Sequence, residues 1–334
     1  MTKQEDPTPI NAPAAAAALP SRQKLTSSLG NVLGRYGLFV ALIILSVGLA
    51  LVSPYFLTVN NLINVFLQAS INLIVAVGMT FVITSGGIDL SVGSIVAVAG
   101  MVMADLLAQK SGLPIAVSMA LLVGTACGFV NGFLITRLRL PPFIVTLGMM
   151  SILRGVALIF NEGRPIYGLP QQQVRVISGD IGIIPIPVLI ALAVALIFHF
   201  VLRNTKIGEY TTAIGGNEEA TRLSGINVRR YKVIVYSLSG LLCGLAGLVL
   251  TARLSAAEPI AGIGFELDAI AATVMGGTSL AGGEGTVIGT IMGALIMSIL
   301  RNGLNLLNIQ AYYQQVAIGF VIILAVSIDR LRKK

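Results

Sequence analysis

Charged residues, histidine and cysteine are scarce in this sequence, and tryptophan is absent. Asp, Glu, Lys and Arg make up 11% of its 334 residues, whereas soluble domains contain about 25%, so the composition excludes an ordinary soluble globular protein. The single histidine, His199, excludes a histidine-rich metal site. Cys127 and Cys243 lie in separate apolar segments, which favours two buried thiols over a disulfide or a metal pair. The sequence therefore predicts no metal and no other cofactor.

Nucleotide-binding and hydrolytic motifs are missing as well. No GxxxxGK[ST] phosphate-binding loop, HExxH zinc motif or GxSxG nucleophile turn occurs in the sequence. A membrane enzyme is therefore a weak alternative. If ATP powers this protein, the ATPase must be another polypeptide.

Long apolar segments dominate what is present. The sequence is 55% hydrophobic with a mean hydropathy of +0.90, and it contains repeated apolar stretches of about 17–25 residues, long enough to cross a bilayer core of about 30 Å. The prediction is an all-α polytopic membrane protein, a helical bundle of about 10 transmembrane segments with a range of about 8–10. The eighth segment is short and is predicted to be broken or re-entrant. The predicted spans are Gly37–Val52, Leu62–Thr84, Ser91–Leu107, Pro114–Ile135, Phe143–Phe160, Ile186–Leu202, Val233–Ala252, Phe265–Met275, Thr286–Leu300 and Tyr312–Ile328.

The distribution of positive charge sets the orientation. With the N-terminus inside, most of the 22 lysine and arginine residues fall on the inner side, as cytoplasmic loops require. Both termini are therefore predicted to be cytoplasmic, and the net charge of +8 reflects topology rather than nucleic-acid binding. Residues 1–34 are rich in Pro, Ala and Ser and are predicted to form a disordered cytoplasmic tail, followed by one transmembrane domain over residues 35–334.

A few ionisable residues lie within or at the ends of the predicted spans. Arg154 is inside its span and is expected to extend toward the outer interface rather than to line a functional cavity. Asp89, Glu266 and Asp268 are near segment ends, where they are expected to cap helices or to pair with arginines. Acidic residues at segment ends do not form the deep relay that an ion-coupled secondary carrier usually needs.

Glycines recur at helix-packing spacing and in two similar turns. The turns, Gly86–Gly93 (GGIDLSVG) and Gly276–Gly283 (GGTSLAGG), are compatible with an internal repeat that places interruptions near a substrate route, or with two tight cytoplasmic turns. Small residues four positions apart let helices approach closely in lipid, and these are assigned to the bundle core. They are Gly124, Gly128 and Gly132; Gly240 and Gly244; Gly285, Gly289 and Gly293.

One charged island, Gly215–Val228, interrupts the apolar sequence in its most basic internal loop. Asn217 is a favourable N-cap, acidic residues follow it in the first turn, and Gly225 is a typical helix terminator. The pattern predicts a helix of about seven residues, which is too short to be stable alone in water. The helix must dock either on a cytosolic partner or on its own bundle.

Several of these motifs, in this order, resemble the ribose-type sugar permeases of ATP-binding-cassette (ABC) transporters. They are IGGNEEATRLSGINV with YSLSGLLCGLAGL, GGIDLSVGS, ELDAIAATVMGGTSLAGGEGTVIGT and LRNGLNLL. The resemblance extends over about residues 37–328 and implies a permease domain with a cytoplasmic coupling loop over residues 203–232. It also implies a homodimer that works with a cytosolic ATP-binding subunit and a periplasmic sugar-binding protein to import a monosaccharide such as ribose.

The resemblance assigns the charged island to contact with the ATPase. Charged side chains there would fix the register, Ala220 and Leu223 would bury apolar surface, and replacing Glu219 by proline is expected to uncouple ATP hydrolysis from transport. The residues assigned to this contact are Asn217, Glu218, Glu219, Ala220, Arg222 and Leu223.

An amide stripe on the second span is the candidate translocation pathway. Asn61, Asn64, Gln68 and Asn72 follow helical spacing, and amides can donate to and accept from sugar hydroxyls. We assign Asn64, Gln68 and Asn72 to the pathway; the alternative is hydrogen bonding between helices. The sequence leaves two rival functions open, a branched-chain amino acid permease of the same wider family and an ion-coupled secondary carrier, and it does not name the sugar.

Overall fold

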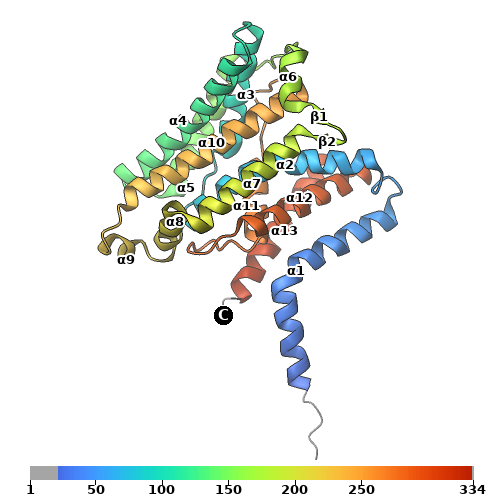
Figure 1. Cartoon of the computed structure of the whole chain (residues 1–334), viewed down its shortest axis with the longest axis vertical. Coiled ribbons are helices and arrows are strands. Elements are labelled where there is room, and N and C mark those ends of the chain that lie inside the picture. Colours follow the sequence, from blue (N-terminus) through green and yellow to red (C-terminus); the bar gives the residue numbers. More distant parts are fainter. Residues whose placement is uncertain (1–21, 333–334) are drawn as a thin grey trace, which may run out of the picture.

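The computed structural model describes residues 22–332, and the chain is a bundle of helices (Figure 1). Residues 1–21 of the predicted tail lie outside the described residues, and the first helix begins at Arg22, inside that predicted tail. The helices are α1 (Arg22–Val52), α2 (Val59–Thr84), α3 (Val92–Ala108), α4 (Leu113–Arg137), α5 (Pro142–Phe160), α6 (Gln171–Ser178), α7 (Ile186–Asn204), α8 (Lys206–Gly216), α9 (Glu218–Leu223), α10 (Val228–Leu254), α11 (Phe265–Met275), α12 (Val287–Leu306) and α13 (Ala311–Arg332).

A helix occupies each predicted span. In the described part of the chain, 6 helices are long and apolar enough to cross a membrane, namely α2, α4, α5, α7, α10 and α12, and the shorter apolar helices are Gly37–Val52 and Val92–Ala108. Helix α11 has 11 residues and, at about 1.5 Å per residue, covers roughly half of a bilayer core. The eighth predicted span is therefore a half-length helix between two irregular segments.

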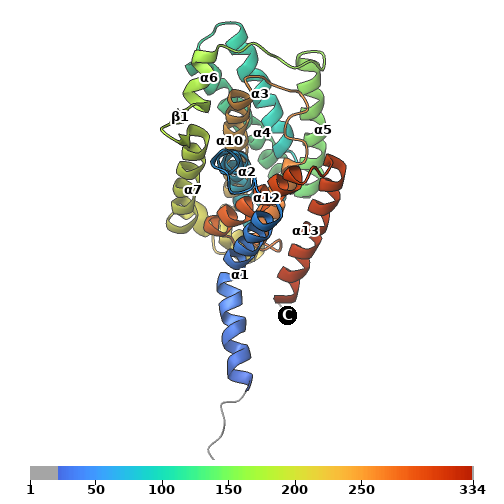
Figure 2. The ribbon, with the colours of Figure 1, turned by 90° about the vertical axis from the view of Figure 1, so that its right-hand side faces the viewer.

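Helix α2 is the central helix of the bundle. It packs against α7, α10, α11 and α12, and Figure 2 shows it surrounded by its neighbours. Its second half is apolar on every face, and side chains such as Ile74 and Phe81 are fully inaccessible. An all-round apolar helix is typical of a buried position.

Glycine allows close backbone contact between α4 and α10. A Cβ atom at Gly128 would overlap the carbonyl of Tyr236, and one at Gly240 would overlap the carbonyl of Gly124. The two backbones thus meet directly, which agrees with the assignment of these glycines to the bundle core.

The two ends of the bundle carry different structures. Helices α8 and α9 lie at the lower left of Figure 1, and α6 with a short hairpin lies at the opposite end. The hairpin pairs β1 (Asp180–Ile181) with β2 (Ile184–Pro185) in an antiparallel register. The predicted topology makes the end with α8 and α9 the cytoplasmic end.

Candidate functional site

The charged island folds as the short helix α9, and its ends are those that the sequence predicts. The Asn217 side chain accepts a hydrogen bond from the Ala220 N–H over 2.9 Å, which satisfies one of the unpaired donors of the first turn. At the other end, Gly225 has φ +84, and its N–H donates to the Arg222 carbonyl over 3.1 Å, so the left-handed glycine ends the helix. The helix has 6 residues, against about seven predicted from its caps.

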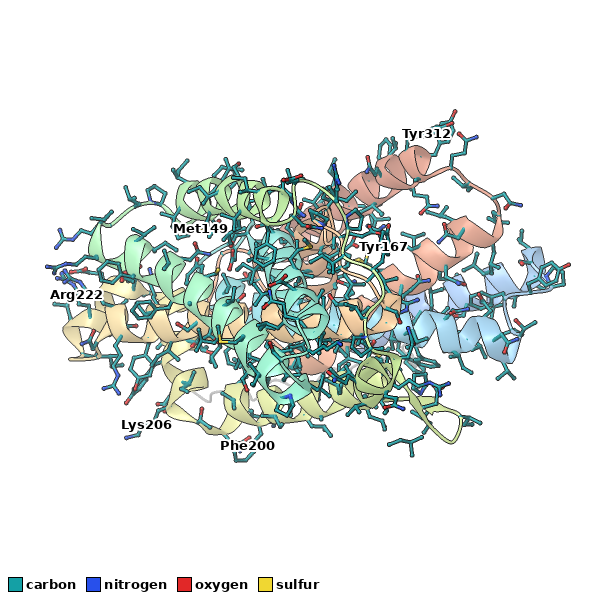
Figure 3. The ribbon with its side chains drawn as sticks, turned by 90° about the horizontal axis from the view of Figure 1, so that it is seen from above. Met149, Tyr167, Phe200, Lys206, Arg222 and Tyr312 are labelled. Carbon is teal, nitrogen blue, oxygen red and sulfur yellow. The ribbon has the colours of Figure 1, made fainter. Side chains whose placement is uncertain are left out.

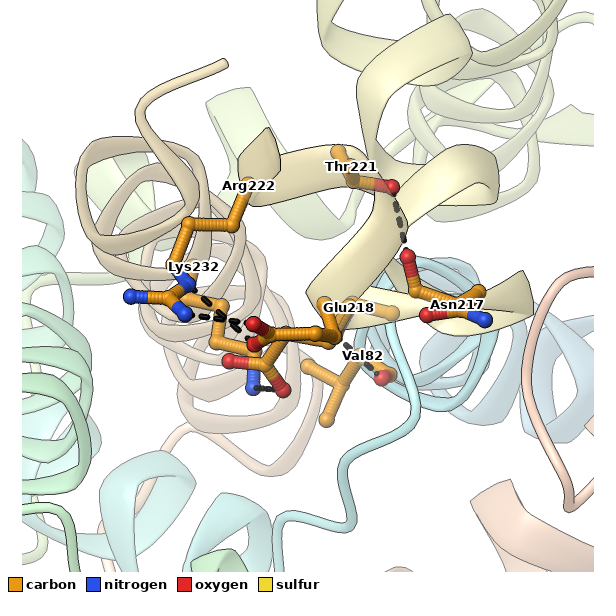
Figure 4. A network of polar contacts seen from close by, with 8 residues as sticks. Val82, Asn217, Glu218, Thr221, Arg222 and Lys232 are labelled. Carbon is orange, nitrogen blue, oxygen red and sulfur yellow. Dashed lines mark hydrogen bonds and ion pairs between the residues drawn. The ribbon is translucent and has the colours of Figure 1, made fainter. Parts of the chain in front are cut away.

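Ion pairs order the charged side chains of α9 (Figure 4). Arg222 pairs with Glu219 within the helix, and Lys232 of α10 binds Glu218 over 2.6 Å. The Arg222 guanidinium lowers the pKa of the Glu219 carboxyl below its ordinary value. Exposed pairs add little stability, so these contacts chiefly hold the charges in a fixed pattern.

Helix α9 leaves most of its surface uncovered. Of its side chains only that of Thr221 is buried, and Leu223 is 77% exposed. Figure 3 shows Arg222 at one extremity of the molecule. A six-residue helix with an exposed leucine buries too little apolar surface to be stable by itself, and the outward face of α9 has no contact in the described part of the chain that would cover Leu223.

The end of α8, just before α9, packs against the two glycine-rich turns. A Cβ atom at Gly215 would overlap the carbonyl oxygen of Thr84, the last residue of α2, and would press on the backbone of Gly283. Gly283 in turn donates its N–H to the same Thr84 oxygen over 2.9 Å, and the Cα of Gly86 lies against Gly282. The two turns therefore meet one another and the end of α8.

This seating links α9 to the centre of the bundle. The backbone of Gly215 touches the end of α2 and the turn that follows α11. The rings of Tyr210 and Tyr231 pack edge to face at 4.7 Å between centroids and hold α8 to α10. Because the Gly215 contact is backbone to backbone, no flexible side chain separates the end of α8 from the end of α2 or from the turn that follows α11.

The structure divides the amide stripe of α2. Asn61 exchanges hydrogen bonds with Asn302 of α12 over 3.0 and 2.8 Å, so it joins two helices. Asn64 is exposed, and Gln68 and Asn72 are partly buried. The Asn72 Oδ1 is buried without a hydrogen-bond partner in the described part of the chain, so this amide retains an acceptor for a further group.

Replacing Asn61 by leucine is expected to lower stability without lowering flux per folded molecule. The Asn61–Asn302 pair should have a coupling energy of about 0.6–1.7 kcal/mol, since each single variant leaves the other amide unpaired. A double-mutant cycle with Asn302→Leu, read out by thermal unfolding in detergent, measures this coupling. A coupling energy indistinguishable from zero would contradict the assignment.

Arginines inside the bundle make internal contacts. Arg154, which is expected to extend toward the outer interface, donates from its Nη1 to the carbonyl oxygens of Pro259 and Ala261 over 2.7 and 2.8 Å. Both carbonyls belong to the loop between α10 and α11 on the predicted outer side. Arg301 of α12 pairs with the buried Asp268 of α11 over 2.7 Å. The sequence left open whether Asp268 caps a helix or pairs with an arginine, and the structure shows the pair, with a partner on the next helix.

Residues 61–326 match the sequence model of the family described as branched-chain amino acid transport system / permease component. This stretch is most of the chain, and the protein therefore belongs to that family of membrane permeases. It is a transport subunit and a multi-pass protein of the bacterial inner membrane, as its relatives and its apolar helices indicate.

Within this family, the chain falls among the sugar permeases of ABC importers. The ribose import permease protein RbsC of Escherichia coli is 48% identical over 300 residues, which cover 88% of this chain and 93% of that protein. RbsC of Haemophilus influenzae is 45% identical over 305 residues, 90% of this chain and 94% of that protein. The L-arabinose transport system permease protein AraH of Escherichia coli is 38% identical over 313 residues, 93% and 95% of the two chains. No solved structure matches.

Proposed function

We propose that this protein is the membrane-spanning subunit of an ABC importer that carries ribose or a similar monosaccharide into the cell. Permeases named for ribose, allose and arabinose match nearly the whole chain, with the ribose permeases at 44–48% identity. This pattern favours a sugar over a branched-chain amino acid, although the family description names the latter.

A separate ATP-binding subunit drives transport through α9. The observation that carries this proposal is the exposure of α9 together with the tight seating of the preceding segment on the bundle. Leu223 and Ala220 supply apolar contact, and the paired charges of Glu219 and Arg222 fix the position of the ATP-binding subunit on α9. Asn217 and Glu218 fix the helix through its N-cap and through Lys232.

An ion-coupled secondary carrier is the less favoured function. Such a carrier has no use for an exposed, capped helix that is linked rigidly to the bundle. Its ionisable residues would be expected along an open route, whereas Asp268 is bound to Arg301, Arg154 is bound to two loop carbonyls, and Asp89 is fully buried away from any open route.

The assembly follows from the same resemblance. Two copies of the chain form the transport unit in the bilayer, each with about ten spans and with both termini in the cytoplasm. A periplasmic sugar-binding protein delivers the substrate at the end of the bundle that carries α6 and the β1–β2 hairpin. The helices at all ten predicted positions and the placement of α8 and α9 at the opposite end support this arrangement.

The amides of α2 contact the passing sugar. Asn64, Gln68 and Asn72 offer donors and acceptors to hydroxyl groups, and Asn72 has a buried oxygen without a partner. Contacts of this kind are weak, which suits a subunit that must release its substrate after each cycle.

Replacing Asn64, Gln68 and Asn72 together by leucine is expected to lower sugar flux about tenfold or more, since three hydrogen-bonding groups would be lost from the route. Assembly with the ATPase should persist because these residues lie far along α2 from Thr84. Uptake by proteoliposomes and co-purification of the ATPase provide the two readouts. Unchanged flux would reject the pathway assignment.

Reconstitution tests the proposed function as a whole. The permease would be placed in proteoliposomes with the ATPase and the sugar-binding protein encoded beside it, and uptake of labelled ribose would be compared with that of labelled leucine. ATP-dependent uptake of ribose, and not leucine, is expected only when all components are present. Uptake by the permease alone under a proton gradient would contradict the proposal.

A further inference from the structure

A buried cluster of oxygen-bearing side chains lies between the first glycine-rich turn, α4 and α10. Asp89 and Ser91 belong to the turn that precedes α3, Asn131 to α4, and Tyr236 and Ser239 to α10. All five are buried, with exposed fractions of 0% for Asp89, Asn131 and Ser239 and 1% for Tyr236. None of the functional contacts described above uses this cluster.

Some of the hydrogen-bonding groups of the cluster are paired with one another. Asp89 Oδ1 accepts from the backbone N–H and the hydroxyl of Ser91 over 2.9 and 2.6 Å, and Asn131 Nδ2 donates to the same hydroxyl oxygen over 2.8 Å. Four buried oxygens then have no partner in the described part of the chain. They are Asp89 Oδ2, Asn131 Oδ1, Tyr236 OH and Ser239 Oγ.

These four oxygens are grouped around one carboxylate. Asp89 and Asn131 bind the same Ser91 hydroxyl, so their remaining oxygens are neighbours. Ser239 Oγ lies close to the Asp89 carboxylate but outside hydrogen-bond geometry, and Tyr236 lies close enough for the carboxylate to act on its hydroxyl. The Tyr236 hydroxyl lies against Gly87, where a Cβ atom would overlap it.

The charge of this cluster is uncompensated. Among the side chains that the structure describes, no lysine, arginine or histidine forms an ion pair with Asp89, and a buried carboxylate without a counter-charge is costly. A proton on Oδ2 would also remove the charge, but the new O–H would donate to only one of the neighbouring oxygens. A ligand that carries positive charge balances the carboxylate and contacts several of these oxygens at once.

We propose that this cluster binds one hard monovalent cation, Na⁺ or K⁺, with Asp89 as the charged ligand and Asn131, Ser239 and Tyr236 as neutral oxygen ligands. Hard cations prefer carboxylate, carbonyl and hydroxyl oxygens, and one carboxylate balances one positive charge. The described residues contain no group of three or more His, Cys, Asp and Glu side chains suited to a metal, so a transition metal does not fit. The cation would fix the turn whose Gly86 lies against Gly215 and Gly282.

The test is the thermal stability of the purified full-length permease in detergent at constant ionic strength. Replacing choline chloride by NaCl or KCl should raise the Tm saturably, by about 2 °C or more, since a ligand that binds only the folded state stabilises it. Asp89→Asn should abolish this rise and should not lower the Tm in choline chloride, because it removes an unpaired charge. Asp105→Asn, which alters a partly exposed carboxylate bound to Gln109, should retain the full rise.

A second variant decides the question if Asp89→Asn does not fold. Ser239→Ala removes one neutral ligand and should raise the half-saturating cation concentration about tenfold. Absence of any cation-specific rise in the wild-type protein would overturn the proposal. Such an absence would point to an ordered water or a protonated acid in the cluster. An equal rise in the wild type and Asp89→Asn, or an unchanged half-saturating concentration in Ser239→Ala, would also overturn the proposal and would show that the cation acts elsewhere on the protein.

Discussion

Replacing Gly215 by alanine is expected to reduce ATP-driven sugar uptake about tenfold or more while the ATPase still binds. The new methyl group would overlap the Thr84 carbonyl oxygen and press on the Gly283 backbone, so α8 must move away from both turns. Overpacking of this kind typically costs about 1–3 kcal/mol, and an increase of about 1.4 kcal/mol in the barrier to the transport step slows it tenfold. Uptake and ATP hydrolysis by the same proteoliposomes measure the loss of coupling.

The neighbouring glycine provides a matched control. Gly216 is also in α8, but a Cβ atom there would have no neighbour within 4 Å, so Gly216→Ala should behave as the wild type. The amount of folded permease is checked by size-exclusion chromatography for both variants. Wild-type uptake by folded Gly215→Ala would show that the contact of Gly215 with the two turns does not transmit motion from the ATPase to the bundle. Equal losses in the two variants would show that the effect is not specific to the contact.

Replacing Leu223 by aspartate is expected to lower uptake about tenfold or more by weakening attachment of the ATPase. Leu223 is 77% exposed, so its substitution should leave the fold of the permease intact. Full burial of a leucine side chain is worth about 1.5–3 kcal/mol, and an aspartate there would add a desolvation cost. Co-purification of the ATPase with the permease reports the attachment directly.

Leu138→Asp is the control for this variant. Leu138 is 58% exposed, lies between α4 and α5 on the predicted cytoplasmic side, and is outside the charged island. It should therefore retain the ATPase. Retention of the ATPase and normal uptake by Leu223→Asp would exclude this side chain from the docking contact, and loss in both variants would indicate a general effect of negative charge on that side.

Local signals account for the parts of this protein that the sequence predicted well. The N-cap Asn217 and the terminator Gly225 act within a few residues, and the structure ends α9 as they require. Apolar length likewise located a helix at each predicted span, including the half-length helix Phe265–Met275. These features depend on neighbouring residues in the chain, so a single sequence contains them.

Contacts between distant segments were not predictable in this way. The sequence showed two similar glycine-rich turns but not that they meet one another and Gly215, because close backbone approach depends on the folded arrangement of several helices. The amide stripe had the right period, yet Asn61 is bound to Asn302 on α12. Helical spacing defines a face of a helix, and it does not say whether that face meets another helix or a pathway.

The structure also changes the choice of a disruptive variant. Glu219→Pro was the variant expected from the sequence to uncouple the motor. Glu219 is the second residue of α9, where proline interrupts no hydrogen bond within the helix, so this change should act more weakly than predicted. Gly215 and Leu223 are better positions. Gly215 packs the end of α8 against the bundle, and Leu223 lies on the exposed face of α9 that is proposed to bind the ATPase.

The central claim, that a separate ATPase acts on α9, is tested most directly by photo-cross-linking in the reconstituted importer. A photoreactive phenylalanine analogue would replace Leu223 in one variant and Leu138 in a second, and each permease would be purified with its ATPase and binding protein. If the ATPase acts on α9, position 223 should cross-link to the ATP-binding subunit with a yield that changes when ATP is added, and position 138 should cross-link much more weakly. A cross-link from position 223 only to the permease itself, or none to the ATPase, would contradict this claim.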